Sequence, residues 1–111
     1  MALTIVESPF RGDLERNKRY LHRCILDSIS RREIPFASHA FYTQFLDDDN
    51  PGDRFLETVL GYNFWEYADR VAFYTDYGMT TGMLESHARC VDIHKRYEMR
   101  SIGKNDAQDP H

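Results

Sequence analysis

The sequence predicts an α/β fold with a parallel sheet, on three observations. Short β-prone apolar runs alternate with longer helical patterns four times along the 111 residues. The run at residues 71–74 is apolar on both faces, as central parallel strands are. A loop with proline and glycine follows the first run, at residues 8–13, where folds of this class bind ligands. A chain of this length favours one compact domain.

Periodicity and turn residues assign the elements in chain order. The expected strands are residues 3–6, 34–37, 71–74 and 98–102, and the expected helices are residues 14–32, 39–46, 54–68 and 83–95. The first strand is an apolar run that ends before proline and glycine. Asp13 is expected to cap the first helix, which is amphipathic from Tyr20 onward. The second strand follows a polar turn, and Ser38 is expected to cap the short helix after it.

The second half begins with an acidic, turn-rich loop at residues 47–53. Its spacing fails the EF-hand pattern, because Thr58 or Val59 stands where that pattern needs glutamate, so a surface loop is expected. The next helix has apolar residues at three- and four-residue spacing, and these are expected to form its buried face. They are Phe55, Leu56, Val59, Leu60, Phe64 and Tyr67. A glycine-bearing loop separates the third strand from the last helix, and the fourth strand follows.

Four strand–helix alternations predict a parallel sheet covered on both faces, with right-handed crossovers. The glycine loop after the first strand places that strand centrally, which gives the order 2-1-3-4. The expected architecture is therefore a three-layer sandwich of the flavodoxin or Rossmann-like kind, with a four-stranded parallel sheet. It spans residues 1–103, and residues 104–111 are expected to form a polar C-terminal tail.

Composition and charge narrow the classes of function. Apolar residues make up 41% and charged residues 29%, as in soluble globular proteins, and the net charge is −4. That charge gives no general attraction to nucleic acid or anionic lipid, and no run approaches the ~20 apolar residues of a membrane span. Cys24 and Cys90 lie in helical patterns, so free buried thiols in a reducing cytoplasm are expected. Cys90 and His94 have helical spacing but no second pair of ligands, so we expect no metal and no cofactor.

The loop at residues 8–13 is the first candidate for ligand binding. Gly12 allows the backbone to approach a ligand closely, and the helix that follows favours an anion at its N-terminus. Arg11 offers a bidentate guanidinium for a phosphate. An exposed loop arginine without a ligand is the simpler alternative, because many such loops contain these residue types.

Glu85 is the candidate catalytic carboxylate, in the helix that follows Gly82. A carboxylate beneath a sugar can stabilise the oxocarbenium-like state of N-glycosidic cleavage, or bond to C1′. The alternative is a glutamate that stabilises the first turn of its helix through the helix dipole.

Three further polar residues flank the predicted strands. Asp69 precedes the third strand, where a cap or turn role is the alternative to orienting a catalytic group. Asp76 follows that strand and is expected to contact a sugar hydroxyl or base, or to form an Asx turn. His39 follows the second strand and is expected to polarise a leaving base, or simply to begin a helix.

These segments together resemble the nucleoside 2-deoxyribosyltransferase-like superfamily, especially its 2′-deoxynucleoside 5′-monophosphate N-glycosidase branch. Small phage-type proteins share the same pattern. Four short motifs carry the resemblance across residues 3–102: Ser8-Pro9-Phe10-Arg11-Gly12, Ala37-Ser38-His39, Ala68-Asp69-Arg70-Val71 and Gly82-Met83-Leu84-Glu85. The chain departs from the family pattern at Glu7, where relatives often have a small or apolar residue. Its sheet is also expected to have one strand fewer than the sheet of the full transferases.

The resemblance implies a site and an activity. The implied catalytic residues are Glu85, Asp69 and His39, and the implied substrate-binding residues are Ser8, Phe10, Arg11, Gly12, Asp76, Gly82 and Met83. Several relatives place the glutamate one residue further from Gly-Met, which would put Ser86 in the catalytic position. Family members commonly build sites at subunit interfaces, so a homodimer or higher oligomer is expected.

The leading hypothesis is cleavage or transfer at the N-glycosidic bond of a nucleoside 5′-monophosphate or nucleoside. The alternative within the same fold is a protein that binds a nucleotide without turnover, to sequester or sense it. A third hypothesis is a protein-interaction module that exposes Tyr62, Phe64 and Trp65.

Overall fold

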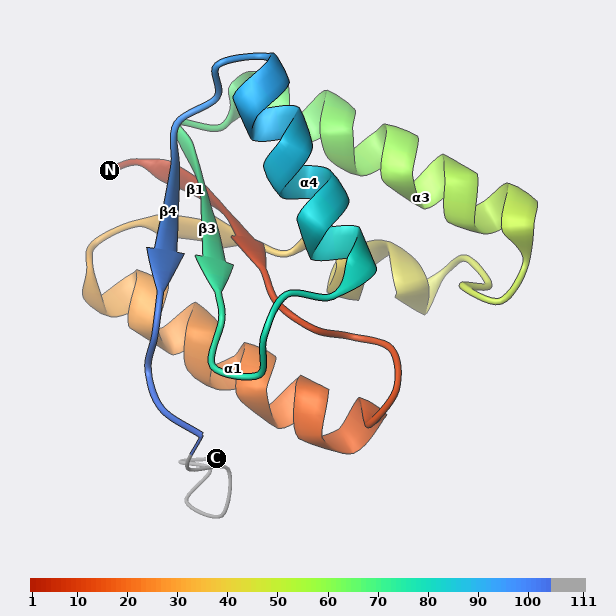
Figure 1. The fold of residues 1–111 in the computed structure, drawn as a ribbon, viewed down its shortest axis with the longest axis horizontal. Helices are drawn as coiled ribbons and strands as arrows, with labels where there is room; N and C mark the ends of the chain where they lie inside the picture. Colours follow the sequence, from red (N-terminus) through yellow and green to blue (C-terminus); the bar gives the residue numbers. More distant parts are fainter. Residues whose placement is uncertain (105–111) are drawn as a thin grey trace.

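The computed structural model describes residues 1–104, and the expected tail at residues 104–111 lies almost entirely outside this range. Four parallel strands form one sheet in the order β2-β1-β3-β4, so the predicted order is confirmed (Figure 1). The strands are β1 (Leu3–Glu7), β2 (Ile34–Phe36), β3 (Arg70–Tyr74) and β4 (Tyr97–Arg100). The helices are α1 (Leu14–Ser30), α2 (Ser38–Phe41), α3 (Pro51–Phe64) and α4 (Thr81–Asp92), with 3₁₀ turns η1 (Tyr42–Gln44) and η2 (Trp65–Tyr67).

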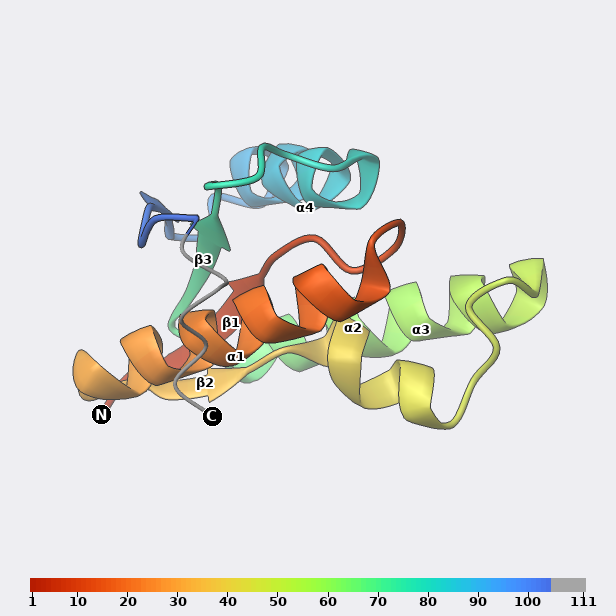
Figure 2. The ribbon, with the colours of Figure 1, turned by 90° about the horizontal axis from the view of Figure 1, so that it is seen from below.

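Helices cover both faces of the sheet, as the three-layer prediction requires. Figure 2 shows α4 and α1 on opposite sides of the strands. The two apolar clusters separate by strand alternation: Val71 and Phe73 of β3 pack on the side of α3 and α4, whereas Ala72 and Tyr74 pack against α1. Among residues 1–104, no helix is long and apolar enough to cross a membrane.

Helix caps explain where the predicted boundaries were right and wrong. The Asp13 carboxylate accepts from the Arg16 amide, so α1 begins as predicted. Asn50 caps α3 instead, and Pro51 occupies its first turn, so α3 begins three residues earlier than predicted. Thr80 caps α4 by accepting from the Met83 amide, which places Glu85 in the second turn. Ser38 is the first residue of α2 and gives no side-chain cap.

The predicted buried face of α3 is confirmed only in part, because Phe64 packs against the apolar cluster whereas three of the six predicted residues are exposed. Phe55 is 71% exposed, and Leu56 and Tyr67 are also exposed. Thr58 and Gly61 border the cavity, and Gly61 and Trp65, just after the helix, are buried. A Cβ on Gly61 would lie 2.8 Å from the Ser38 hydroxyl oxygen, so glycine permits the close approach of α3 to α2. The inner face of α3 is partly polar because it borders a cavity.

A buried ion-pair network fixes the edge of the sheet at β4. Arg100 donates to both carboxylate oxygens of Glu33, at 2.8 and 2.7 Å, and also pairs with Glu98. Arg70 bridges the same two glutamates, each at 3.1 Å. Burial alone would raise the pKa of Glu33, but the donors from Arg100 and Ser28 outweigh it and lower the pKa to about 2. Every charge in this network is therefore paired, which a buried position demands.

Candidate functional site

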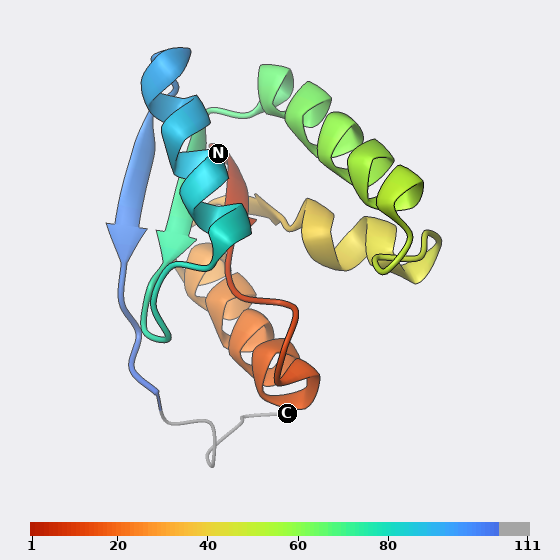
Figure 3. The same ribbon diagram turned by 45° about the vertical axis from the view of Figure 1, so that its right-hand side comes forward.

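A cavity of about 480 Å³ opens at the carboxyl edge of the sheet, between α3, α4 and the loops after β1 and β3. Its volume falls within the range of about 300–1,000 Å³ typical of small-molecule sites. Figure 3 shows α3 and α4 on one side of the sheet, with the loop after β1 beneath them. The Arg89 guanidinium of α4 lies 4.4 Å from the centre of the Tyr62 ring of α3, and this cation–π contact joins the two helices.

Most of the residues predicted for the site line this one cavity. They come from the β1–α1 loop, from α2 and from the start of α4, which lie far apart in the sequence. They are Ser8, Phe10, Arg11, Gly12, His39, Gly82, Met83 and Glu85. The topology brings them together because the loops after two adjacent central strands meet at the same edge.

Asp69 and Asp76 are not among the cavity-lining residues. Asp69 accepts from the Leu3 amide at 2.7 Å, at the amino end of β1 and therefore at the opposite edge of the sheet. This position does not support the expected role of orienting Glu85. Asp76 accepts from the Tyr20 and Ser101 hydroxyls and from backbone amides after β4. Its carboxylate is thus occupied in holding the chain after β4, and this contact set does not support a substrate role.

Ser8 and His39 form a polar pair on the cavity wall. The Ser8 hydroxyl lies 3.2 Å from His39 Nε2, and the Phe10 ring meets the imidazole edge-on. Burial lowers the pKa of His39 to about 4, despite the opposing charge of Asp48. A neutral imidazole is a hydrogen-bonding group at pH 7 and a weak general base, so His39 is suited to positioning a ligand through Ser8.

Arg11 lines the cavity, but its guanidinium is already engaged. Its Nε lies 3.2 Å from Asp48 and its Nη2 lies 2.8 Å from Asp49. These ion pairs tie the β1–α1 loop to the loop before α3 at the cavity mouth. A phosphate would therefore have to compete with two carboxylates for Arg11.

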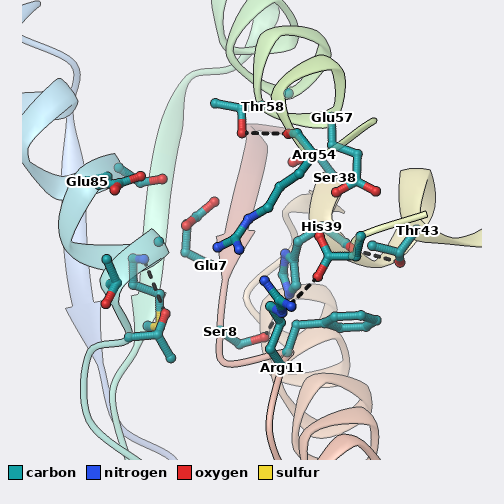
Figure 4. A pocket seen from close by; sticks show the side chains of 18 of the residues that line it. Glu7, Ser8, Arg11, Ser38, His39, Thr43, Arg54, Glu57, Thr58 and Glu85 are labelled. Atoms are coloured by element: carbon teal, nitrogen blue, oxygen red, sulfur yellow. Dashed lines mark hydrogen bonds and ion pairs between the residues drawn. The ribbon is translucent and has the colours of Figure 1, made fainter. Parts of the chain in front are cut away.

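Arg54 is a cationic residue that sequence reasoning missed. It extends from the first turn of α3 into the cavity (Figure 4). The structure gives its guanidinium no hydrogen bond or ion pair within residues 1–104. Spacing could have revealed it, because Arg54, Thr58 and Gly61 recur at helical intervals on one face. Arg54 is the more available donor for an anionic ligand.

Glu7 was likewise missed as a site residue, and it is the last residue of β1. Strand alternation places it on the same face as Leu3 and Ile5, which pack in the apolar cluster beneath α3 and α4. Its carboxyl group points into the middle of the cavity (Figure 4). Burial raises the pKa of Glu7 to about 7, against the lowering effect of a hydrogen bond with Ser86. An acid at an inward position of a central strand was the available sequence signal.

The cavity side of α4 presents Ser86 more deeply than Glu85. Met83, Ser86 and Cys90 are the buried residues of α4, whereas Glu85 is exposed on the rim of the cavity. The Ser86 hydroxyl lies 3.5 Å from the Tyr62 hydroxyl, which adds α3 to this contact. Two carboxyl groups therefore border the cavity here, Glu7 on the floor and Glu85 on the rim.

A second acidic pair lies at the other side of the cavity. Burial, a hydrogen bond with Asp48 and the charges of Asp48 and Asp53 raise the pKa of Glu57 to about 7. Within residues 1–104 no three His, Cys, Asp or Glu side chains are grouped so that they could hold a metal ion. The cavity thus combines arginines, a neutral histidine, carboxyl groups and the Tyr62 ring, which equips it to bind a polar ligand with an anionic end and to transfer protons.

The chain is thus a parallel α/β protein with a cavity at the carboxyl edge of its sheet. Residues 2–100 match the family described as Domain of unknown function (DUF7768), and the chain belongs to this family. No curated protein and no solved structure matches the chain.

The remaining sequence expectations concern thiols and aromatic residues. Cys24 and Cys90 are free and buried, as predicted. Trp65 is only 2% exposed, and Tyr62 and Phe64 pack against the same apolar cluster. These three residues therefore do not form the exposed interaction surface that the third hypothesis requires.

Proposed function

We propose that this protein binds a nucleoside 5′-monophosphate in the cavity and cleaves its N-glycosidic bond, by hydrolysis or by transfer of the sugar. The observation that carries the proposal is the convergence of Glu7, Glu85, Arg54 and Tyr62 on one cavity of nucleotide size. The resemblance of four short motifs to the nucleoside 2-deoxyribosyltransferase-like superfamily points to the same chemistry.

The proposed phosphate subsite lies at the end of the cavity formed by the β1–α1 loop and α3. Arg54 supplies an available guanidinium, and Ser8 and Gly12 border the same space. Arg11 would complete this subsite by exchanging Asp48 or Asp49 for the phosphate, since both ion pairs lie at the cavity mouth.

The proposed sugar and base subsite lies between β1, α3 and α4. Glu85 on the rim would face C1′, where it would stabilise the positive charge that develops as the glycosidic bond breaks, or bond to that carbon. Tyr62 would offer a ring or hydroxyl to the base. The scheme requires no metal and no organic cofactor.

The experiment incubates the pure protein with a panel of nucleoside 5′-monophosphates and nucleosides and detects free base by chromatography. The native protein is expected to release base, and Glu85→Ala is expected to lose at least a hundredfold in rate while it still binds the nucleotide. A Glu85→Ala variant with native activity would refute the role of Glu85. Glu66→Gln is the matched control, because Glu66 is exposed and outside the cavity lining.

Nucleotide binding without turnover is the second candidate. The exposure of Glu85 favours it, because this carboxylate is less enclosed than a catalytic group for hydrolysis needs to be. No base release, together with thermal stabilisation by one nucleotide, would support this candidate.

We also propose that the chain forms a homodimer or larger homo-oligomer. Exposed aromatic and aliphatic side chains lie within residues 41–45, at and after the end of α2, and on α3, and a second copy would cover them. They are Phe41, Phe45, Phe55 and Leu56.

A reducing compartment such as the cytoplasm is the proposed location of the protein, because its two cysteines are buried free thiols.

A further inference from the structure

Resting on the function proposed above, we propose that Glu7 is the general acid that protonates the departing nucleobase. Its position is the first argument. Glu7 ends the central strand β1 on the face that packs beneath α3 and α4, so its carboxyl group lies on the cavity floor and not at the solvent rim. A ligand in the cavity would lie directly against it (Figure 4).

The surroundings of Glu7 are the second argument, and Glu33 provides the comparison within the same molecule. Glu33 is buried, and Arg100 and Arg70 stabilise its carboxylate. Glu7 forms no ion pair with a described residue, and its hydrogen-bond partner is the neutral hydroxyl of Ser86. The charged groups that share its cavity include Arg54 of α3 and Glu85 of α4 (Figure 4). A carboxyl group so placed favours its neutral, proton-bearing form. The pKa of Glu7, raised to about 7, agrees with this geometry and gives an acid that holds its proton near neutral pH.

The reaction balances with water as the only co-reactant. The C1′–N bond breaks and its electron pair passes to the base, while the Glu7 O–H proton transfers to a ring nitrogen of the base. Glu7 is left as the carboxylate, and Glu85 stabilises the positive charge on the sugar. Water then bonds to C1′ and its proton passes to Glu7, which restores the carboxylic acid. One nucleotide and one water give one base and one sugar phosphate.

The test compares two leaving groups. The first is an ordinary nucleotide that the native protein cleaves, and the second is 7-methylguanosine 5′-monophosphate, or its 2′-deoxy counterpart where the protein requires deoxyribose. The methylated base is already cationic, so it departs without a proton. Glu7→Gln is expected to lose at least a hundredfold in rate on the ordinary nucleotide and less than tenfold on the methylated one. Glu85→Ala is expected to lose activity on both.

The pH profile gives a second readout. The native rate on the ordinary nucleotide should fall above about pH 7, and this alkaline limb should be absent for Glu7→Gln. Ser86→Ala removes a hydrogen bond that lowers the pKa of Glu7, so its alkaline limb should move to higher pH. Glu66→Gln should keep the native profile.

The outcomes separate the two proposals. Native activity in Glu7→Gln, or an equal loss on both substrates, would overturn the role of Glu7 and leave the N-glycosidase proposal standing. Absence of base release from both substrates with the native protein would overturn the N-glycosidase proposal, and the role of Glu7 with it.

Discussion

Glu7 and Glu33 meet opposite electrostatic environments within one small domain. Glu33 receives two arginines and a serine hydroxyl, and its pKa falls to about 2. Within residues 1–104 no ion pair reaches Glu7, its hydrogen-bond partner is the Ser86 hydroxyl, and its pKa rises to about 7. The two pKa values differ because the two residues have different surroundings. Glu33 forms ion pairs with Arg100 of β4, whereas Glu7 faces a cavity. A buried carboxylate without a cationic partner lowers the stability of the fold. Such destabilising groups are found most often at functional sites.

Glu7→Gln should therefore stabilise the protein at alkaline pH. A carboxyl group with a raised pKa in the folded state binds its proton more tightly there than in the unfolded chain. Native stability should fall as the pH rises from about 4.5 to about 7 and stay low above that window. At pH 8, Glu7→Gln should gain on the order of 1–2 kcal/mol in the free energy of unfolding, with a smaller gain at pH 4.5. Urea unfolding at both pH values measures this, and equal effects at both would contradict it.

Arg54→Gln should weaken the binding of a nucleoside 5′-monophosphate by about 10- to 100-fold, the value of a charge-assisted hydrogen bond. Binding of the matching nucleoside should change little, because it lacks the phosphate. Arg11→Gln should have the smaller effect of the two, since Asp48 and Asp49 already occupy its guanidinium. Calorimetric titration of both ligands against both variants measures the difference. An equal loss of nucleotide and nucleoside binding in Arg54→Gln would remove its role in phosphate binding.

The helix α3 shows how far periodicity can mislead about an element. Its apolar residues recur at helical spacing, so the sequence predicts that they face the core. In the structure Phe64 packs against the core, whereas Phe55 and Leu56 are exposed and the side of α3 toward the cavity carries Arg54, Thr58 and Gly61. Periodicity locates an amphipathic face, but it does not say whether the apolar side meets the core or another molecule.

The exposed apolar residues of α3 are the proposed contact between copies of the chain. Phe55→Ser should shift the protein from oligomer toward monomer, because it removes a large exposed ring from the proposed interface. Val91→Ser is the matched control, since Val91 is an exposed apolar residue on a different helix. Sedimentation velocity over a range of protein concentrations measures the distribution. A native protein that stays monomeric throughout would contradict the proposed oligomer.

The architecture of the whole molecule could be predicted because it depends on patterns spread along the chain. Four alternations, a strand apolar on both faces and a glycine loop after β1 together determine the sheet order that the structure has. This topology also predicts that the site lies at the carboxyl edge of the sheet, where Ser8, His39 and Glu85 line one cavity.

Side-chain contacts within the site could not be predicted in the same way. The sequence does not reveal that the Asp76 carboxylate accepts hydrogen bonds from backbone amides after β4. Nor does it reveal that Arg11 forms ion pairs with Asp48 and Asp49. These contacts join segments far apart in the chain, and no periodic pattern encodes them. Asp69 lies away from the cavity for a simpler reason, since it precedes β3 and contacts the amino end of β1, at the opposite edge of the sheet.

We propose above that a nucleotide bound in the cavity is cleaved between sugar and base. Mass spectrometry of a single reaction, in which the native protein is incubated with nucleoside 5′-monophosphates, tests it most directly. Free base and sugar phosphate are expected in equal amounts, both growing with time and both lost in Glu85→Ala. Intact nucleotides after prolonged incubation, at protein concentrations where one of them binds, would contradict it.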